Sequence, residues 1–212
     1  MVVMNAADDR IFDRDLIPIE PKRNGHFNLF YHGTMGKRHG IDLAIKAVNQ
    51  IRELAPDIQL ILHGDGEYRQ ELESLSEKLG LQNQVHFQLW GLPTSELPKV
   101  LLMADLAIVP YRNDVFTGGI LQTKLMEYFA LGIPAIAART PGIEAYFDET
   151  TVQFFEPGDI DDLVQSILML YNDRPLLSHY AQNITKFNAR YNWPDQRMNL
   201  LKRVDLLIEG SD

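Results

Sequence analysis

Short apolar runs alternate along the chain with longer segments in which apolar residues recur at helical spacing. Six runs that predict buried strands lie at residues 27–33, 58–64, 85–90, 106–111, 134–138 and 152–155. Helical patterns lie at residues 41–54, 67–80, 95–104, 120–131, 160–172, 175–191 and 194–209. Several strands are apolar almost throughout, which indicates burial on both faces. The pattern predicts an α/β fold: a doubly wound, Rossmann-like parallel sheet of about six strands, with helices on both faces and extra C-terminal helices.

The order of the elements also predicts where a ligand binds. In such sheets, ligands bind beyond the carboxyl ends of the parallel strands. The expected functional rim is therefore made by the loops that follow Gly33, Gly64, Trp90, Tyr111 and Ala138.

The first 24 residues differ from the rest of the chain. They hold two prolines among charged residues, so residues 1–24 are predicted to be an interdomain linker and residues 25–212 a single domain. Ser95 and Asp159 are the expected N-caps of the helices that follow them, and Pro194 is expected to separate the last two helices.

Composition narrows the function classes. The chain has 212 residues, of which 45% are apolar and 23% charged, as in soluble globular proteins. A formal charge of −9 argues against broad nucleic-acid binding but permits a local cationic site for a phosphate. The absence of cysteine excludes disulfides and thiolate metal ligands, and is consistent with a reducing compartment such as the cytoplasm. No apolar run approaches the roughly 20 residues of a transmembrane helix, and no signal-peptide pattern is visible.

The stretch after the fourth predicted strand holds two glycines, a helix start, a lysine and a glutamate, in that order. Gly118 and Gly119 allow an anion to approach closely, and a following helix offers free N–H groups and the positive end of its dipole. Lys124 adds a positive charge, and Glu127 can accept hydrogen bonds from sugar hydroxyls. The order is consistent with a diphosphate followed by a ribose. A flexible loop and an amphipathic helix with a surface Lys–Glu pair explain the same spacing.

The loop after the first strand holds a second candidate. Two glycines flank Lys37 and Arg38, which could bind the same diphosphate from the other side, Arg38 by bidentate contact. A solvated basic turn is the alternative interpretation. His32 and His39 are interpreted as structural hydrogen-bonding residues rather than catalytic ones.

The remaining loops are less specific. Gly64 and Gly66 allow either a tight turn that caps the next helix or the approach of a ligand. Trp90 could flank a flat base, although core or rim packing is the favoured interpretation. No group of acidic residues or histidines has metal-ligand spacing, and no Ser-His-Asp set is visible, so neither a metal site nor that kind of nucleophilic catalysis is expected.

Several motifs together resemble one known family over nearly the whole chain. The fragments that carry the resemblance are VVMNAADDRIF, YHGTMGKRHGIDLAIKA, IQLILHGDGEYRQELE, VHFQLWGLPTSELPKVLLMADLAIVPYR and LQTKLMEYFALGIPAIAA. The last is the most specific. The chain resembles the C-terminal, donor-binding half of the retaining GT-B glycosyltransferases of family 4, the glycosyl transferases group 1.

The resemblance implies an enzyme that transfers a sugar from a nucleotide-diphosphate sugar. By position, Glu127 holds the ribose hydroxyls, and the turn from Gly118 to Thr123 meets the diphosphate or the sugar. Lys37 and Arg38 neutralise the leaving diphosphate, as transition-state stabilisation requires. The donor-binding positions that follow from the motifs and the resemblance are Gly33, Thr34, Gly64, Gly66, Asp114, Gly118, Gly119, Thr123, Lys124 and Glu127. No metal or other cofactor is expected, because phosphate stabilisation without a bound metal is usual in this fold.

The sequence departs from the family pattern at several places, and the Pro of the family's Pro-Thr-Lys motif is Gln122 here. The first residue of the family's Glu-x7-Glu pair falls at Gly119, so its role at the sugar is vacant or taken by Asp114. The usual Arg of the first loop is Thr34, and the usual Lys is closest to His39.

Length is the largest departure, because a complete GT-B enzyme also has an acceptor-binding domain of about equal size. The chain is therefore expected to be inactive without an N-terminal acceptor domain, supplied in cis or in trans. Any contact with the cytoplasmic face of a membrane is expected through that domain. The alternatives are a nucleotide-binding scaffold domain with a decayed site and a GT-B nucleotide-sugar epimerase-like enzyme.

Overall fold

The computed structural model describes residues 4–18, 25–88 and 91–209. Trp90, interpreted above as a candidate base contact or packing residue, lies outside the described residues, as do parts of the predicted linker.

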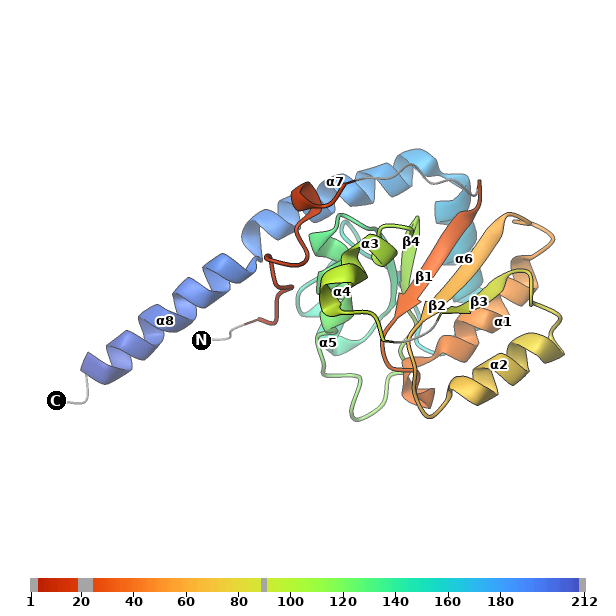
Figure 1. The fold of residues 1–212 in the computed structure, drawn as a ribbon, viewed down its shortest axis with the longest axis horizontal. Helices are drawn as coiled ribbons and strands as arrows, with labels where there is room; N and C mark the ends of the chain where they lie inside the picture. Colours follow the sequence, from red (N-terminus) through yellow and green to blue (C-terminus); the bar gives the residue numbers. More distant parts are fainter. Residues whose placement is uncertain (1–3, 19–24, 89–90, 210–212) are drawn as a thin grey trace.

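A parallel sheet of six strands forms the centre of the domain (Figure 1). The strands are β1 (Phe27–His32), β2 (Ile58–His63), β3 (Val85–Gln88), β4 (Leu106–Val109), β5 (Ala135–Ala138) and β6 (Gln153–Phe155). Their order is β3-β2-β1-β4-β5-β6, so the direction of winding reverses between β1 and β4. Every residue of β1 and β2 is buried, as their apolar sequences predict for central strands. The predicted doubly wound α/β fold is confirmed.

The two central pairings differ in length. β1 pairs with β2 along all six residues, from Phe27–Ile58 to His32–His63. The ladder between β1 and β4 contains only the pairs Leu29–Leu106 and Phe30–Ala107. The strands therefore part just before the carboxyl end of β1. This is the point at which doubly wound sheets open a crevice for ligands.

Helices surround the sheet and continue past it. They are α1 (Ile41–Ile51), α2 (Arg69–Lys78), α3 (Leu97–Leu101), α4 (Thr123–Ala130), α5 (Pro141–Glu144), α6 (Ile160–Asn172), α7 (Arg174–Arg190) and α8 (Trp193–Glu209). Three short 3-10 helices are η1 (Arg14–Leu16), η2 (Lys37–His39) and η3 (Thr94–Glu96). The helix α1 packs against α2 and α6, and α4 packs against α7.

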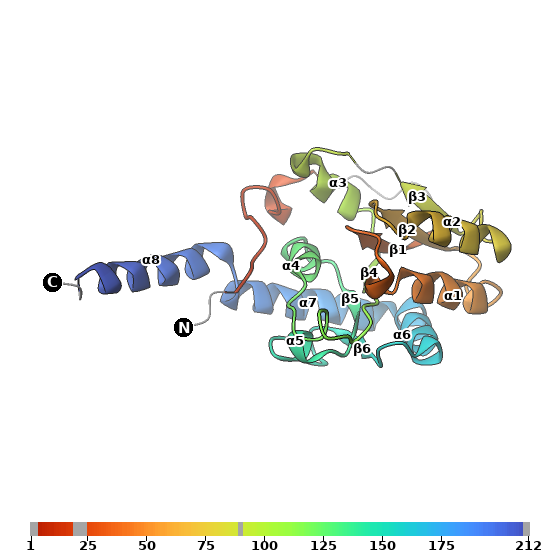
Figure 2. The ribbon, with the colours of Figure 1, turned by 90° about the horizontal axis from the view of Figure 1, so that it is seen from below.

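The last helix, α8, projects from the body of the domain (Figures 1 and 2). The segment that begins at Met4 lies beside the junction of α7 and α8, where the backbone N–H of Met4 donates to Oε1 of Gln196 at 3.1 Å. The side chains of Leu206, Leu207 and Ile208 on α8 are each at least 60% exposed. None of the helices that the structure describes is long and apolar enough to cross a membrane.

Helix boundaries test the predicted caps. The side chain of Asp159 accepts the N–H groups of Asp161 and Asp162 at 2.9 and 3.0 Å, which confirms it as an N-cap. The break between α7 and α8, just before Pro194, is also confirmed. The prediction for Ser95 is wrong. Ser95 lies inside η3, and α3 begins two residues later after Glu96, whose side chain makes no capping bond.

The glycine pair and its helix are also arranged differently from the prediction. The helix expected from residue 120 begins at Thr123, so three residues separate Gly119 from α4. The N-cap of α4 is Gln122, which makes no side-chain capping bond. The glycine pair therefore belongs to a separate turn, tied to α5 by a hydrogen bond of 2.8 Å from the N–H of Gly142 to the carbonyl of Gly118. The pattern did not predict α5, which has only four residues.

Candidate functional site

Side chains from β1, the loop after β4 and α4 meet where β1 and β4 part. We call this set the inner cluster; it consists of Tyr31, His32, Tyr111, Lys124 and Glu127. A second set of residues borders it on the solvent side. We call this set the outer rim; it consists of Lys37, Arg38, Glu67, Arg112, Asp114, Val115 and Phe116, which line an open depression of about 560 Å³.

Lys124 lies at the centre of the inner cluster and is only 7% exposed. Its Nζ donates to the hydroxyl of Tyr31 at 2.8 Å, and that hydroxyl donates to the carbonyl of Thr34 at 2.6 Å. The ammonium lies 4.1 Å from the ring centroid of Tyr31 and 4.9 Å from that of Tyr111. Burial lowers the pKa of Lys124 to about 7, while the nearby carboxylate of Glu127 acts in the opposite direction. Lys124 is thus a buried amine that supports the loop after β1 through Tyr31.

Glu127 reaches the surface from one turn further along α4. Its Oε2 contacts Nε2 of His32 at 2.5 Å, and 24% of its side chain is exposed. His32 is 4% exposed and packs edge-on against the ring of Tyr128, with 4.7 Å between centroids. Burial lowers the pKa of His32, although the hydrogen bond to Glu127 opposes this, so we assign a neutral imidazole that donates from Nε2. Within the described residues, Nδ1 of His32 is buried without a hydrogen-bond partner.

The outer rim presents two exposed cations. Lys37 and Arg38 both belong to η2, directly after the loop that Lys124 supports. The guanidinium of Arg38 lies 4.7 Å from the ring centroid of Phe116, and that ring is 60% exposed. These side chains can move toward a charged ligand at small cost, because solvent surrounds them.

Arg112 joins the rim to the framework of the domain. It makes two hydrogen bonds of 2.8 Å to the buried carboxylate of Asp42 in α1, and a third, of 2.6 Å, to the carbonyl of Lys37. Burial by itself raises the pKa of Asp42, but hydrogen bonds from Arg112 and Lys46 outweigh it and lower that pKa. The backbone of Arg112 also donates to the carbonyl of Arg38 at 3.0 Å. The loop after β4 is therefore fixed to both η2 and α1.

Asp114 orders its own loop. Its Oδ1 accepts the N–H of Phe116 at 2.9 Å, the N–H of Thr117 at 2.7 Å and the hydroxyl of Thr117 at 2.8 Å. The backbone and side-chain hydrogen bonds from Thr117 lower the pKa of Asp114. The carboxylate therefore faces its own turn as an ionised group.

The predicted glycines fall into two groups. A Cβ at Gly64 would lie 2.0 Å from the carbonyl oxygen of Gly33, and one at Gly66 would lie 2.5 Å from that of Met35. These two glycines let the loops after β1 and β2 pack backbone against backbone. A Cβ at Gly118 would collide with Asn113, whereas one at Gly119 would meet no described atom within 4 Å. Gly119 is therefore the position of the pair that faces open space.

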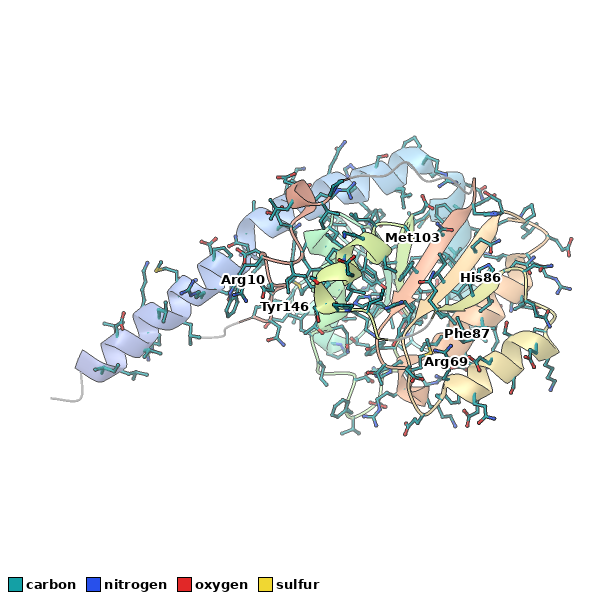
Figure 3. The ribbon with its side chains drawn as sticks, viewed as in Figure 1. Arg10, Arg69, His86, Phe87, Met103 and Tyr146 are labelled. Carbon is teal, nitrogen blue, oxygen red and sulfur yellow. The ribbon has the colours of Figure 1, made fainter. Side chains whose placement is uncertain are left out.

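Arg69 anchors the loop that contains Gly64. From the first turn of α2, its Nη1 donates to the carbonyl of Gly64 at 2.8 Å, and its guanidinium lies 5.8 Å from the ring centroid of Phe87 in β3 (Figure 3). Arg69 therefore joins the loop after β2 to β3 at the edge of the site.

The structure thus brings some predicted residues together and separates others. Gly33 lies against the inner cluster, since a Cβ at Gly33 would lie 3.1 Å from Nζ of Lys124. Lys37, Arg38 and Asp114 line the outer rim. Thr34 is exposed on the loop after β1, and Thr123 is exposed at the start of α4. Sequence reasoning did not select Tyr31, Tyr111 and Arg112. Their positions at the ends of strands β1 and β4, on the expected rim, are the signal that could have found them.

Within residues 4–18, 25–88 and 91–209, no group of three or more acidic residues or histidines is placed to hold a metal ion.

The strand order and its reversal between β1 and β4 define a doubly wound domain of the kind that forms one half of a GT-B protein. Solved structures with this fold include the C-terminal domain of a glycosyl transferase group 1 family protein from Francisella tularensis. It has a TM-score of 0.71 and 18% identity, and the match covers 87% of this chain and 97% of that one. HepE from Anabaena in complex with UDP gives a TM-score of 0.82 at 19% identity, over 97% of this chain and 57% of that one.

The sequence model of the family described as "Glycosyl transferases group 1" matches residues 13–187. The chain belongs to this family, which confirms the resemblance. A GDP-mannose-dependent alpha-(1-6)-phosphatidylinositol monomannoside mannosyltransferase from Mycolicibacterium smegmatis is 32% identical over 61% of this chain and 35% of the relative. A sulfoquinovosyl transferase from Arabidopsis thaliana is 25% identical over 74% of this chain and 29% of the relative. The chain thus spans about a third of the length of these relatives.

Proposed function

We propose that this chain is the donor-binding half of a glycosyltransferase that moves a sugar from a nucleotide-diphosphate sugar to an acceptor, with retention of configuration. The observation that carries this proposal is the carboxylate of Glu127. It lies near the point where β1 and β4 part, with one oxygen held by His32 and a quarter of the side chain exposed. A fixed carboxylate at this place is suited to two adjacent ribose hydroxyls.

The diphosphate and the sugar then lie along the loops beside Glu127. The backbone at Gly33 and Thr34 faces the diphosphate, with the buried ammonium of Lys124 behind it. The open space at Gly119 and the start of α4 at Thr123 accommodate the sugar. Gly64, Gly66 and Gly118 act on the donor through the loops they shape, because each is closely packed against neighbouring atoms.

Lys37 and Arg38 act in the chemical step. Negative charge develops on the leaving diphosphate as its bond to the sugar breaks, and cations aimed at that charge lower the barrier. Both side chains are exposed on η2 and can close over the bound diphosphate. On this proposal the charge is balanced by protein cations, and no metal is required.

The acceptor is bound by a second half of the enzyme, and transfer requires both halves. The relatives support this division, because each is about three times longer than the segment that matches. We place the donor half in the cytoplasm, with any membrane contact made through the acceptor half. The names of the relatives support two nucleotides, since one uses GDP-mannose and HepE was solved with UDP.

The alternative function is a nucleotide-binding scaffold whose catalytic site has decayed. Asp114 is the observation that favours it. Asp114 was the candidate to replace the family's first Glu, and three donors of its own loop already bind its Oδ1. A scaffold of this kind binds nucleotide but supports no transfer.

Calorimetric titration with UDP, GDP and ADP, without added metal, tests the proposal. We expect saturable binding of one nucleotide, weakened in Glu127→Ala. The matched control is Glu77→Ala, which removes an exposed carboxylate on α2, outside the inner cluster and the outer rim. Failure of all three nucleotides to bind, both to this chain and to the chain joined to an acceptor-binding half, would falsify the proposal. Nucleotide binding without sugar transfer in the joined protein would identify the scaffold.

A further inference from the structure

We propose that Lys124 takes up a proton when a nucleoside diphosphate occupies the site, so that a buried cation forms where the ligand needs it. The inference rests on the proposed function, because it assumes that the crevice beside Glu127 holds a nucleotide. It assigns Lys124 a role different from that of a surface point charge.

The position of Lys124 behind the loop after β1 is the first argument. Its Nζ lies 3.1 Å from the place of a Cβ on Gly33, so the missing side chain of Gly33 leaves the space that the ammonium fills. Gly33 directly follows β1 at the crevice. A phosphate at this loop is therefore separated from Nζ by little more than one peptide unit, in surroundings that exclude water.

The groups around Lys124 are the second argument. Groups from every element packed around it face the ammonium: Tyr31 and His32 from β1, His39 from η2, Tyr111 after β4, and Glu127 from its own helix. Burial raises the pKa of both tyrosines, so their hydroxyls are uncharged at neutral pH. Burial lowers the pKa of both histidines, that of His39 to about 4, so these rings are neutral as well. Among these groups, Glu127 alone carries a negative charge, and His32 already engages its Oε2.

The protonation state of Lys124 is consequently balanced in the free protein. Burial brings its pKa to about 7, so near neutral pH the free protein populates both the charged and the neutral form. A diphosphate adds negative charge beside a group that has little other compensation, and this favours the charged form. By linkage, nucleotide affinity falls as the pH rises above about 7, by up to roughly tenfold per pH unit.

The experiment counts protons during nucleotide binding. Wild-type protein is titrated with UDP and GDP at about pH 8, in two buffers with different enthalpies of ionisation. At this pH the terminal phosphate, whose pKa is about 6, is already ionised and adds little to the count. The difference in observed heat between the buffers gives the number of protons taken up. We expect nearly one proton per bound nucleotide.

Two variants assign that proton. Lys124→Met keeps an apolar chain of similar length and should abolish the uptake, whereas His39→Gln, the matched control on the facing element, should preserve it. Saturable binding without proton uptake in the wild type would overturn the inference and leave the proposed function standing. Uptake that persists in Lys124→Met, or disappears in His39→Gln, would also overturn it. Absence of nucleotide binding in the wild type counts against the proposed function instead. If Lys124→Met does not fold, Lys124→Arg provides the same test, because its guanidinium is already charged at this pH and the uptake should again be abolished.

Discussion

The inner cluster and the outer rim carry similar charges in opposite physical settings. Lys124 and Glu127 are held by neighbours and mostly hidden from water, whereas Lys37 and Arg38 are exposed on a short 3-10 helix. Charges in the low-dielectric setting interact strongly and their protonation depends on each neighbour. Exposed charges are screened by salt. The comparison shows that residue type alone does not predict which charged side chains hold a ligand in a fixed position and which ones move toward it after it binds.

Arg112 is the residue whose loss should disturb both regions most. Arg112→Met leaves the Asp42 carboxylate, 5% exposed, with Lys46 as its remaining ion-pair partner among the described residues. Because a buried charge that loses hydrogen bonds is costly, we expect the free energy of unfolding in urea to fall by roughly 2–3 kcal/mol. Lys46→Met is the control and should cost less than about 1 kcal/mol, since the Lys46 side chain is 41% exposed. Equal losses in the two variants would contradict this ranking.

Glu127 should have the next largest effect, on binding rather than stability. We expect Glu127→Ala to weaken nucleotide binding by roughly 1–3 kcal/mol, the cost of losing a charged hydrogen-bond partner. Titration calorimetry measures the affinity, and circular dichroism checks that the fold persists. An unchanged affinity would remove Glu127 from the site and make the inner cluster purely structural.

The burial of Lys124 should change how the free energy of unfolding depends on pH. Its pKa is about 7 in the folded chain and 10.5 as the ordinary value, so between these the unfolded state binds more protons. Relative to Lys124→Met, the wild type should therefore gain stability as the pH rises from 7, by roughly 1–2 kcal/mol at about pH 8.5. Urea unfolding of both proteins across this window measures the difference. Parallel curves would show that Lys124 keeps an ordinary pKa.

The exposed cations should have the smallest effects. We expect Lys37→Ala and Arg38→Ala each to weaken nucleotide binding by about 0.2–1 kcal/mol at low salt, because exposed ion pairs contribute little. The loss should shrink as salt is added, whereas the loss from Glu127→Ala should persist. Titrations at two salt concentrations measure both trends. A loss for Arg38→Ala that is large and insensitive to salt would place it with the inner cluster.

Much of the fold could be predicted because the signals are local. The apolar runs of β1 and β2 identify central strands, and Asp159 caps α6 through hydrogen bonds within its own turn. The start of α4 could not be placed, since the residues from Ile120 are compatible with a helix and only the hydrogen bond from Gly142 to Gly118 shows a separate turn.

The candidate site could be predicted only in part. Its position on the rim and the candidate residue Glu127 followed from strand order and motif. The burial of Lys124 did not, because a lysine in a helix is normally expected to face solvent. Lys124 is buried since β1 and β4 part beside it and two tyrosines, Tyr31 in β1 and Tyr111 just after β4, enclose it. Such a contact joins residues 93 positions apart, so local patterns carry little information about it.

The early end of the β1–β4 ladder has a consequence for how such a domain can change over time. The β1–β4 ladder ends at the pair Phe30–Ala107. There the side chain of Tyr128 bonds to β1, since its hydroxyl donates to the carbonyl of Phe30 at 3.1 Å. Beyond this pair a side chain, and not the β1–β4 ladder, bonds the backbone of β1. Substitutions in the loop after β4 that keep the Arg112 anchor leave the ladder intact, so descendants of one framework can acquire new guests without refolding the sheet that supports them.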